Sequence, residues 1–285
     1  MVPPLEGKLI ADDLTIENRI HAIHKDIWID CPQSRKVLDG ILCMLQAPRR
    51  ATAPCILVCG DGGSGKTTIK DQLEKRNEQI GSPCVFVTMV DKLNPMKLSE
   101  VILEGIGLSP RLALNKKPLP TALGNYLRAM GVRAIVIDEF HEALLVPKNE
   151  QLKNLSLLKG LSGDPFNISI ILLGTKASRN ALMGDPQLSR RYHIYNLEPW
   201  SYNSDFRSFI ATMEQLFKLN RPSGLHQPEM LRFIYERSGG VMDNVVKYLK
   251  GAAIYAVKSG EERITKELIE MAASDPWGYG IATRA

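Results

Sequence analysis

Apolar residues follow two alternating patterns over the middle of the chain, namely short continuous runs and stretches with helical spacing. Each short run is typical of a strand that is buried on both faces. The runs lie near residues 55–60, 84–89, 133–138, 168–173 and 192–197. The helical stretches lie between and around them, at about 66–77, 97–106, 120–130, 150–160 and 177–183. This alternation predicts an α/β fold with a five-stranded parallel sheet that is flanked by helices.

Helical spacing without strands flanks this region on both sides. Two such stretches precede it, at residues 15–27 and about 34–46. Four more follow it and predict a small all-α domain, at 204–219, 227–237, 241–257 and 265–273. We therefore expect an N-terminal arm with leading helices, an α/β core, a helical lid and a flexible C-terminal tail. Their expected bounds are 1–50, 51–197, 198–273 and 274–285.

The composition limits the class of protein without selecting a function. Of the 285 residues, 44% are hydrophobic and 24% are charged, which is ordinary for a folded globular protein. The net charge of +5 is compatible with nucleic-acid contact but does not establish it. The five cysteines lack CxxC spacing, which favours reduced, buried thiols over disulfides or a zinc site. Without a signal peptide or an apolar run of membrane-spanning length, we expect a cytoplasmic protein.

Residues 60–67 match the GxxxxGK[ST] pattern of a phosphate-binding P-loop. A buried strand precedes the pattern and a helix follows it, which is the context that such a loop needs. Glycines let consecutive backbone N–H groups surround an anion, and the helix N-terminus adds a favourable partial charge. Lys66 then reaches the β- and γ-phosphates of a nucleotide, and Thr67 ligates Mg²⁺. The candidate nucleotide contacts in this segment are Gly60, Asp61, Gly62, Gly63, Ser64, Gly65, Lys66, Thr67 and Thr68.

The alternative for this segment is a Gly-rich turn without a ligand, and a second motif argues against it. Four apolar residues lead to Asp138 and Glu139, which places two carboxylates at the C-terminal tip of a buried strand. In an open α/β sheet, ligands bind at that edge. Asp138 would hold the Mg²⁺, while Glu139 would orient and deprotonate an attacking water. Acidic residues also cap strand ends for purely structural reasons, and this alternative stays open.

Three further residues are candidates for the same edge of the sheet. Thr175 follows the fourth strand, where its hydroxyl could bond the γ-phosphate or the attacking water. Arg190 and Arg191 come just before the last strand, where they could serve their own site or reach into a neighbouring subunit. An arginine supplied by a neighbour would stabilise transition-state charge and make hydrolysis depend on assembly. A threonine at a strand end is common, and a solvated basic turn is the alternative for the arginines.

The order of these features resembles that of an AAA+ ATPase: P-loop, paired carboxylates, strand-end threonine, arginines and helical lid. A closer resemblance, to the TniB family and its relative TnsC, covers most of the chain. Both are ATP-dependent regulators of transposition. The Walker motifs are generic, whereas the segment before Pro32 and the Gly-Thr pair that ends the fourth strand are more particular to this group. The segments that carry the resemblance are Trp28–Pro32, Pro48–Arg50, the P-loop, Val136–His141, Leu173–Thr175 and Asp185–Leu188.

The resemblance implies a P-loop NTPase of the AAA+ type that binds ATP with Mg²⁺ and hydrolyses ATP. It implies assembly as a homo-oligomeric ring or filament on double-stranded DNA. The assembly would present a target site to a DDE transposase of the TniA or TnsB type, alongside a target-selection protein of the TniQ type. The phage ATPase MuB is similar in role. On this resemblance the protein is bacterial, is not bound to a membrane and associates with the nucleoid when assembled.

The resemblance also implies roles for individual residues. Thr175 would be the sensor, and one of Arg190 and Arg191 would act in a neighbouring subunit. The residues expected against the adenine are Trp28, Ile29 and Pro32. The expected DNA contacts follow the second strand and are Lys92, Lys97, Lys116 and Lys117. Lysine contacts with phosphates would make DNA binding fall steeply with salt, although a solvated loop is the alternative for Lys116 and Lys117.

One position departs from the AAA+ pattern. AAA+ lids often carry an arginine after a Gly-x-x pattern, and Asp243 stands about where that arginine would be. We therefore expect slower hydrolysis, or coupling to ATP through neighbouring subunits only.

Two other classes of function fit the sequence less well. A self-contained P-loop enzyme, such as a small-molecule kinase, would not need the water-activating pair Asp138 and Glu139, and its lid would be smaller. A STAND-type switch or an initiator-like loader would usually add a sensor domain, a repeat array or a winged helix. Sedimentation with ATP and DNA would separate these classes from an assembling ATPase.

Overall fold

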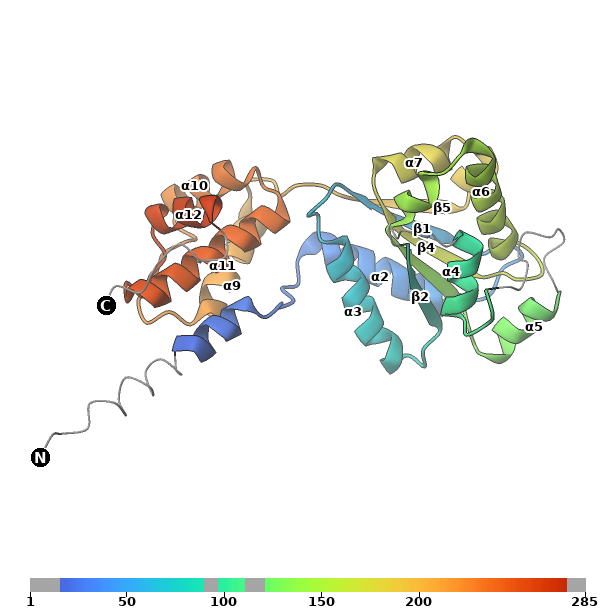
Figure 1. Cartoon of the computed structure of the whole chain (residues 1–285), viewed down its shortest axis with the longest axis horizontal. Helices are drawn as coiled ribbons and strands as arrows, with labels where there is room; N and C mark the ends of the chain where they lie inside the picture. The colour runs from blue at the N-terminus through green and yellow to red at the C-terminus, as the bar shows by residue number, and fades with distance from the viewer. Residues whose placement is uncertain (1–15, 90–96, 111–120, 276–285) are drawn as a thin grey trace, which may run out of the picture. The chain divides into compact units, whose positions relative to one another are not determined.

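The computed structural model describes residues 16–89, 97–110 and 121–275. The chain forms two compact units (Figure 1). The first, called the α/β unit here, spans Pro32–Glu198. The second, called the helical unit, combines residues from 1–31 with residues from 199–285. The chain therefore crosses between the units twice, after Cys31 and after Glu198.

Five parallel strands form the sheet of the α/β unit, in the order β2-β3-β4-β1-β5. The strands are β1 (Cys55–Gly60), β2 (Cys84–Thr88), β3 (Ala134–Asp138), β4 (Ser169–Gly174) and β5 (Tyr192–Leu197). All residues of β1, β3 and β4 are buried, which explains why these strands read as continuous apolar runs. The expected five-stranded parallel sheet is confirmed, and its carboxyl ends share one edge.

Helices cover both faces of this sheet (Figure 1). Figure 1 shows α2 and α3 on one side and α4, α5 and α6 on the other. On the second side, Leu103 of α4, Leu127 of α5 and Leu158 of α6 pack in one core with Ile135 and Ile137 of β3. The helical segments of this unit are α2 (Pro32–Gln46), α3 (Lys66–Gln79), α4 (Leu98–Gly105), α5 (Thr121–Ala129), the 3₁₀ helix η1 (Phe140–Leu144), α6 (Lys148–Ser162), α7 (Lys176–Met183) and α8 (Pro186–Ser189).

The helical unit has a separate apolar core. Phe206, Leu249 and Ile254 are fully or almost fully buried in it. Its C-terminal helices begin where the sequence pattern predicts, and Asn203 and Thr265 cap two of them with side-chain oxygens. They are α9 (Ser204–Phe217), α10 (Pro228–Ser238), α11 (Met242–Ser259) and α12 (Lys266–Ser274). The expected C-terminal all-α region is therefore present.

The sequence predicts one leading segment over residues 1–50, whereas the structure divides these residues between the two units, after Cys31. Residues 16–24 are helical, and Ile16, Ile20 and Ile23 pack against the core of the helical unit. In contrast, α2 belongs to the α/β unit, where Val37 and Ile41 are buried. The apolar spacing correctly predicts both helices but does not say which core each face joins.

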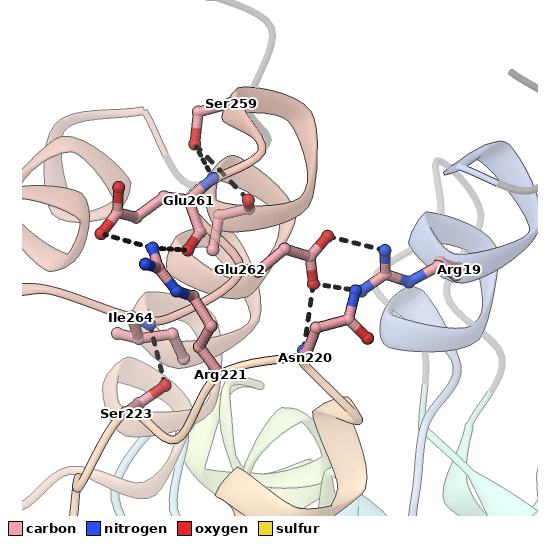
Figure 2. A network of polar contacts seen from close by, with 9 residues as sticks. Arg19, Asn220, Arg221, Ser223, Ser259, Glu261, Glu262 and Ile264 are labelled. Carbon is pink, nitrogen blue, oxygen red and sulfur yellow. Dashed lines mark hydrogen bonds and ion pairs between the residues drawn. The ribbon is translucent and has the colours of Figure 1, made fainter. Parts of the chain in front are cut away.

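A polar network ties the N-terminal helix to the end of the helical unit (Figure 2). The guanidinium of Arg19 donates two hydrogen bonds, of 2.7 and 2.6 Å, to the two carboxylate oxygens of Glu262. Glu262 also accepts a hydrogen bond from the backbone N–H of Asn220 at 3.1 Å. The hydrogen bonds from Arg19 hold the pKa of Glu262 below its ordinary value. The tie is therefore complete above the ordinary glutamate pKa and weakens as the pH falls through the lowered one.

Two smaller observations bear on the sequence expectations. No disulfide joins any of the five cysteines, all of which lie within the described residues; four of them are buried, and Cys43 on α2 is exposed. Within the part of the chain that the structure describes, no helix combines the length and the apolar character that spanning a bilayer requires.

The Arg19–Glu262 pair generates the first prediction. Glu262→Gln keeps the size of the side chain but removes the charge that binds Arg19. We expect amide exchange in residues 16–24 to accelerate about five-fold, because loss of a charge-assisted pair at this depth costs on the order of 1 kcal/mol. Hydrogen–deuterium exchange with mass spectrometry measures the change. Glu229→Gln is the control, since Glu229 is largely exposed in its pair with Lys266. Equal protection of residues 16–24 in all three proteins would contradict the prediction.

Candidate nucleotide site

The candidate site lies at the carboxyl edge of the sheet, where three adjacent strands end. Gly60 ends β1, Asp138 ends β3 and Gly174 ends β4. β4 pairs with β1 on one side and with β3 on the other, so its tip stands between the P-loop and the two carboxylates. The topology therefore brings together motifs that lie far apart in the sequence.

The P-loop runs from Gly60 into the first turn of α3. Gly63 and Gly65 have φ angles of 73° and 89°, which is the left-handed region that glycine adopts without strain. At Gly60 the constraint is space, because a Cβ atom there would lie 2.3 Å from Oγ of Ser64. The loop therefore folds back so closely on its own start that a side chain at Gly60 does not fit.

Lys66 is the first residue of α3 and is buried, with 7% of its surface exposed. Its ammonium donates hydrogen bonds of 2.9 Å to the backbone carbonyls of Gly60 and Asp61. Ser64 Oγ lies 3.5 Å from the same nitrogen. The loop carbonyls therefore hold the ammonium of Lys66 against the loop. Thr67 and Thr68 are exposed in the first turn of α3.

Asp138 is almost completely buried at the tip of β3. Its Oδ1 accepts a hydrogen bond of 2.8 Å from the backbone N–H of Glu139. Burial raises the pKa of Asp138, while this hydrogen bond and the positive charges of Lys70 and Lys66 act in the opposite direction. A buried carboxylate close to the P-loop lysine fits the role of a ligand in the Mg²⁺ shell.

Glu139 has a φ of 52°, in the left-handed region that non-glycine residues rarely adopt. Such strained backbone is concentrated at functional sites, where it sets the direction of a side chain. Oε2 of Glu139 lies 3.1 Å from Nδ1 of His141, although that nitrogen has no hydrogen-bond partner within the described residues. Nε2 of His141 is 3.2 Å from Oε1 of Glu142. The imidazole thus stands between two carboxylates and can steer that of Glu139.

Thr175 begins α7 directly after β4. It is half-buried, and its hydroxyl does not cap the helix. The turn before it is tight, because a Cβ atom on Gly174 would lie 2.4 Å from Oγ of Ser178. Ser178 is itself fully buried, and its hydroxyl lacks a hydrogen-bond partner among the described residues.

Two basic residues at this edge were not predicted from the sequence. Lys176 donates a hydrogen bond of 3.1 Å to the carboxylate of the P-loop residue Asp61, so α7 is tied to the loop. Lys70, one turn after Lys66 on α3, acts on Asp138 through its charge. The signal for Lys176 was its position immediately after the strand-end threonine, and for Lys70 it was the four-residue spacing from Lys66.

The two arginines before β5 have different surroundings. Arg191 donates hydrogen bonds from Nη1 to the carbonyl of Lys159 at 2.9 Å and to Oγ of Ser162 at 2.8 Å. These contacts bind the start of β5 to the end of α6. Arg190 is exposed, and no hydrogen bond or ion pair joins its side chain to another residue of the described chain.

The residues expected against the adenine are divided between the two units. Trp28 and Ile29 are half-buried in the helical unit, where Ile29 packs against the apolar core. Pro32 is exposed and opens α2 in the α/β unit. Asp243, on α11, forms an ion pair of 2.7 Å with Lys247 one turn later, so the position of the expected lid arginine carries a paired carboxylate.

Of the expected DNA-contacting lysines, only Lys97 lies within the described residues. It is exposed at the start of α4, where its backbone N–H donates to the carboxylate of Glu100 at 2.9 Å. Lys92, Lys116 and Lys117 lie outside the described residues.

Comparison with known proteins places the chain in a family. The family model described as Bacterial TniB protein matches residues 19–202. The chain belongs to the TniB family. The match includes the P-loop, the carboxylate pair, Thr175 and both arginines. No curated protein matches this TniB-family chain.

Several solved structures share the fold of this TniB-family protein at low sequence identity. Aeropyrum pernix ORC2, described as ADPNP-ADP complexes, is 16% identical with a TM-score of 0.59, and the match covers 92% of this chain and 72% of that one. Aeropyrum pernix ORC1 in complex with DNA is 16% identical with a TM-score of 0.61, covering 90% and 69%. Cdc6p from Pyrobaculum aerophilum is 16% identical with a TM-score of 0.61, covering 92% and 72%.

The two kinds of glycine in the P-loop generate the second prediction. We expect Gly60→Ala to weaken binding of a fluorescent ATP analogue by about ten-fold or more, because the new Cβ would displace Ser64 and the loop. Gly62→Ala is the matched control, since nothing lies within 4 Å of a Cβ there. Fluorescence anisotropy measures both affinities. Equal affinities of the two variants would show that the close approach at Gly60 does not shape the binding loop.

Proposed function

We propose that this TniB-family protein is an ATPase that binds ATP with Mg²⁺ and assembles on double-stranded DNA. In this proposal, the assembly activates a DDE transposase at the target site, together with a target-selection protein. The observation that carries the proposal is the convergence of Lys66, Asp138 and Glu139 at one edge of the sheet, on three neighbouring structural elements. A nucleotide-binding turn alone would not need a second carboxylate beside the Mg²⁺ ligand.

The residues divide the work of phosphoryl transfer. The loop N–H groups and Lys66 bind the phosphates, and Thr67 and Asp138 hold the Mg²⁺ shell. The Mg²⁺ held by these residues would supply positive charge to the phosphate oxygens. Glu139 accepts a proton from the attacking water and keeps that water in line with the γ-phosphate. Thr175 follows β4, the strand between the P-loop and the carboxylate pair, and its hydroxyl bonds the γ-phosphate.

Arg190 is the better candidate for a residue that acts in a neighbouring subunit. Its side chain is exposed and makes no hydrogen bond or ion pair within the described chain, so it is available to a second copy. Arg191 uses its guanidinium internally, to bind the end of α6. Hydrolysis would then depend on assembly, because one copy would complete the site of the next.

The proposal for DNA rests on other support. Aeropyrum pernix ORC1, which has a similar fold, is described in complex with DNA. The net charge of +5 favours contact with phosphates. We propose that Lys92, Lys97, Lys116 and Lys117 provide sequence-independent contacts, and that the segment with Trp28, Ile29 and Pro32 contacts the adenine.

The third prediction separates ATP binding from hydrolysis. We expect Lys66→Ala to abolish ATP binding and DNA-dependent assembly, since the phosphates lose their cation. We expect Glu139→Gln to bind ATP and to stay assembled, because the amide cannot take a proton from water. Sedimentation with duplex DNA and ATP, beside an ATPase assay, reads out both variants. ATP-stimulated assembly of Lys66→Ala would overturn the nucleotide site, and loss of assembly in Glu139→Gln would make Glu139 structural. Turnover without assembly in the unaltered protein would favour a self-contained enzyme.

The fourth prediction concerns the arginine pair. Arg190→Ala should lower ATP turnover of the assembled protein by about a hundred-fold without changing thermal stability, since only transition-state charge is affected. Arg191→Ala should destabilise the α/β unit by about 1–2 kcal/mol, because two hydrogen bonds to α6 are lost. Steady-state ATPase assays and thermal denaturation measure the two effects. If Arg191→Ala lost turnover and Arg190→Ala lost stability instead, Arg191 would be the residue that acts in the neighbouring subunit.

A further inference from the structure

A hollow at the amino edge of the sheet is lined by arginines. This edge is opposite to the P-loop, because all strands run in the same direction. The hollow is open to solvent on one side. Arg49 and Arg50 line it from the segment after α2, and Arg133 lines it from the start of β3. Asn167 and Ser169 contribute polar groups at the start of β4.

Backbone contacts hold two of the three guanidinium groups in place. Nη2 of Arg49 donates a hydrogen bond of 3.1 Å to the carbonyl of Val132. Nη2 of Arg133 donates a hydrogen bond to the carbonyl of Ala47. Arg49 thus bonds the residue that precedes Arg133, and Arg133 bonds the backbone two residues before Arg49. Because every guanidinium carries five N–H donors, each retains further donors for a ligand.

This arrangement concentrates positive charge without a carboxylate to balance it. In the described part of the chain, no ion pair joins Arg49, Arg50 or Arg133 to an acidic side chain. Burial lowers the pKa of Arg49, and the charges of Arg133 and Arg128 lower it further. Arg49 and Arg50 are exposed and Arg133 is half-buried, so their like charges stand close together and an anion bound among them would offset the repulsion.

A second polar group at the hollow also lacks a partner. Oδ1 of Asn167 is buried and makes no hydrogen bond within the described residues. Its backbone has a φ of 53°, a left-handed conformation that asparagine tolerates better than most residues. A half-turn of the amide presents N–H donors in place of the oxygen. The hydroxyl of Ser169 offers another donor at the same place.

We propose that this hollow is a phosphate-binding pocket, in which Arg49, Arg50 and Arg133 bind one phosphate group. The observation that carries the proposal is three arginines without acidic partners around one hollow that has polar donors at its base. A carboxylate offers two oxygens and one charge, which matches a single guanidinium. A phosphate offers more oxygens and more charge, which fits three guanidinium groups better. The phosphate comes from a DNA backbone or from a free phosphate compound.

Inorganic phosphate is the probe for the first experiment. Because the P-loop also binds phosphate, all proteins carry Lys66→Ala in the full-length chain. Arg50→Gln is the test variant, since Arg50 makes no hydrogen bond in the described chain and the change is not expected to disturb folding. Arg232→Gln is the matched control, because Arg232 is exposed on α10 of the other unit and its side chain makes no hydrogen bond or ion pair within the described chain. Isothermal titration at constant ionic strength measures the affinities.

We expect Arg50→Gln to weaken phosphate binding about five-fold or more and Arg232→Gln to leave it unchanged. Arg49→Lys, which keeps the charge but loses the planar fork, should also weaken binding. No measurable binding, equal binding by all variants or equal weakening in the control would overturn the proposal. Tighter binding of succinate than of phosphate would also overturn it, in favour of a carboxylate from an acidic segment.

A second experiment identifies the source of the phosphate. It measures DNA affinity against salt concentration with ATP present and with Lys66 unaltered. If the DNA backbone is the source, Arg50→Gln lowers the slope of log affinity against log salt by about one. If phosphate binding falls but the slope is unchanged, a free phosphate compound is the source. Failure of the ATPase proposal would leave the first experiment intact, since it does not use the P-loop.

Discussion

Hydrogen bonding of β1 between β4 and β5 is the constraint on which the rest of the molecule depends. It places the P-loop one strand in from the β5 end of the carboxyl edge, with the tip of β4 beside it and that of β3 one strand further. Because all strands are parallel, every polar residue that follows one of them arrives at this edge. The burial of Asp138 and the pairing of Asp61 with Lys176 follow from that ordering, because β4 lies between β3 and β1.

Much of this arrangement could be predicted from the sequence, because the apolar runs of the strands and the P-loop pattern are both strong local signals. Strands that are buried on two faces appear in the sequence as continuous apolar runs. The P-loop pattern identifies Lys66, and an apolar run that ends in two carboxylates identifies Asp138 and Glu139. The remainder depends on which elements become neighbours. Arg190 and Arg191 are indistinguishable in the sequence, and only the position of α6 makes one of them internal. Similarly, the periodicity of Ile16, Ile20 and Ile23 predicts a buried face without naming its partner.

The two edges of the sheet carry basic residues of different kinds. At the carboxyl edge, Lys176 pairs with the carboxylate of Asp61, while Lys66 donates to backbone carbonyls of the P-loop, where we propose that a nucleotide phosphate balances its charge. At the amino edge, Arg49 and Arg133 contact only backbone carbonyls, which compensate a full charge poorly. A lysine suits the first setting as a compact charge, whereas the planar guanidinium suits recognition of an external oxyanion.

The discontinuity of the helical unit affects how the chain emerges during synthesis. Arg19 leaves the ribosome 243 residues ahead of Glu262, and the whole α/β unit is made between them. The apolar face of residues 16–24 therefore stays exposed until α11 and α12 have been synthesised. Contacts so distant in sequence form late and slowly, while the α/β unit can fold as its own strands appear. The helix of residues 16–24 is thus synthesised before the α/β unit and is among the last segments to be buried.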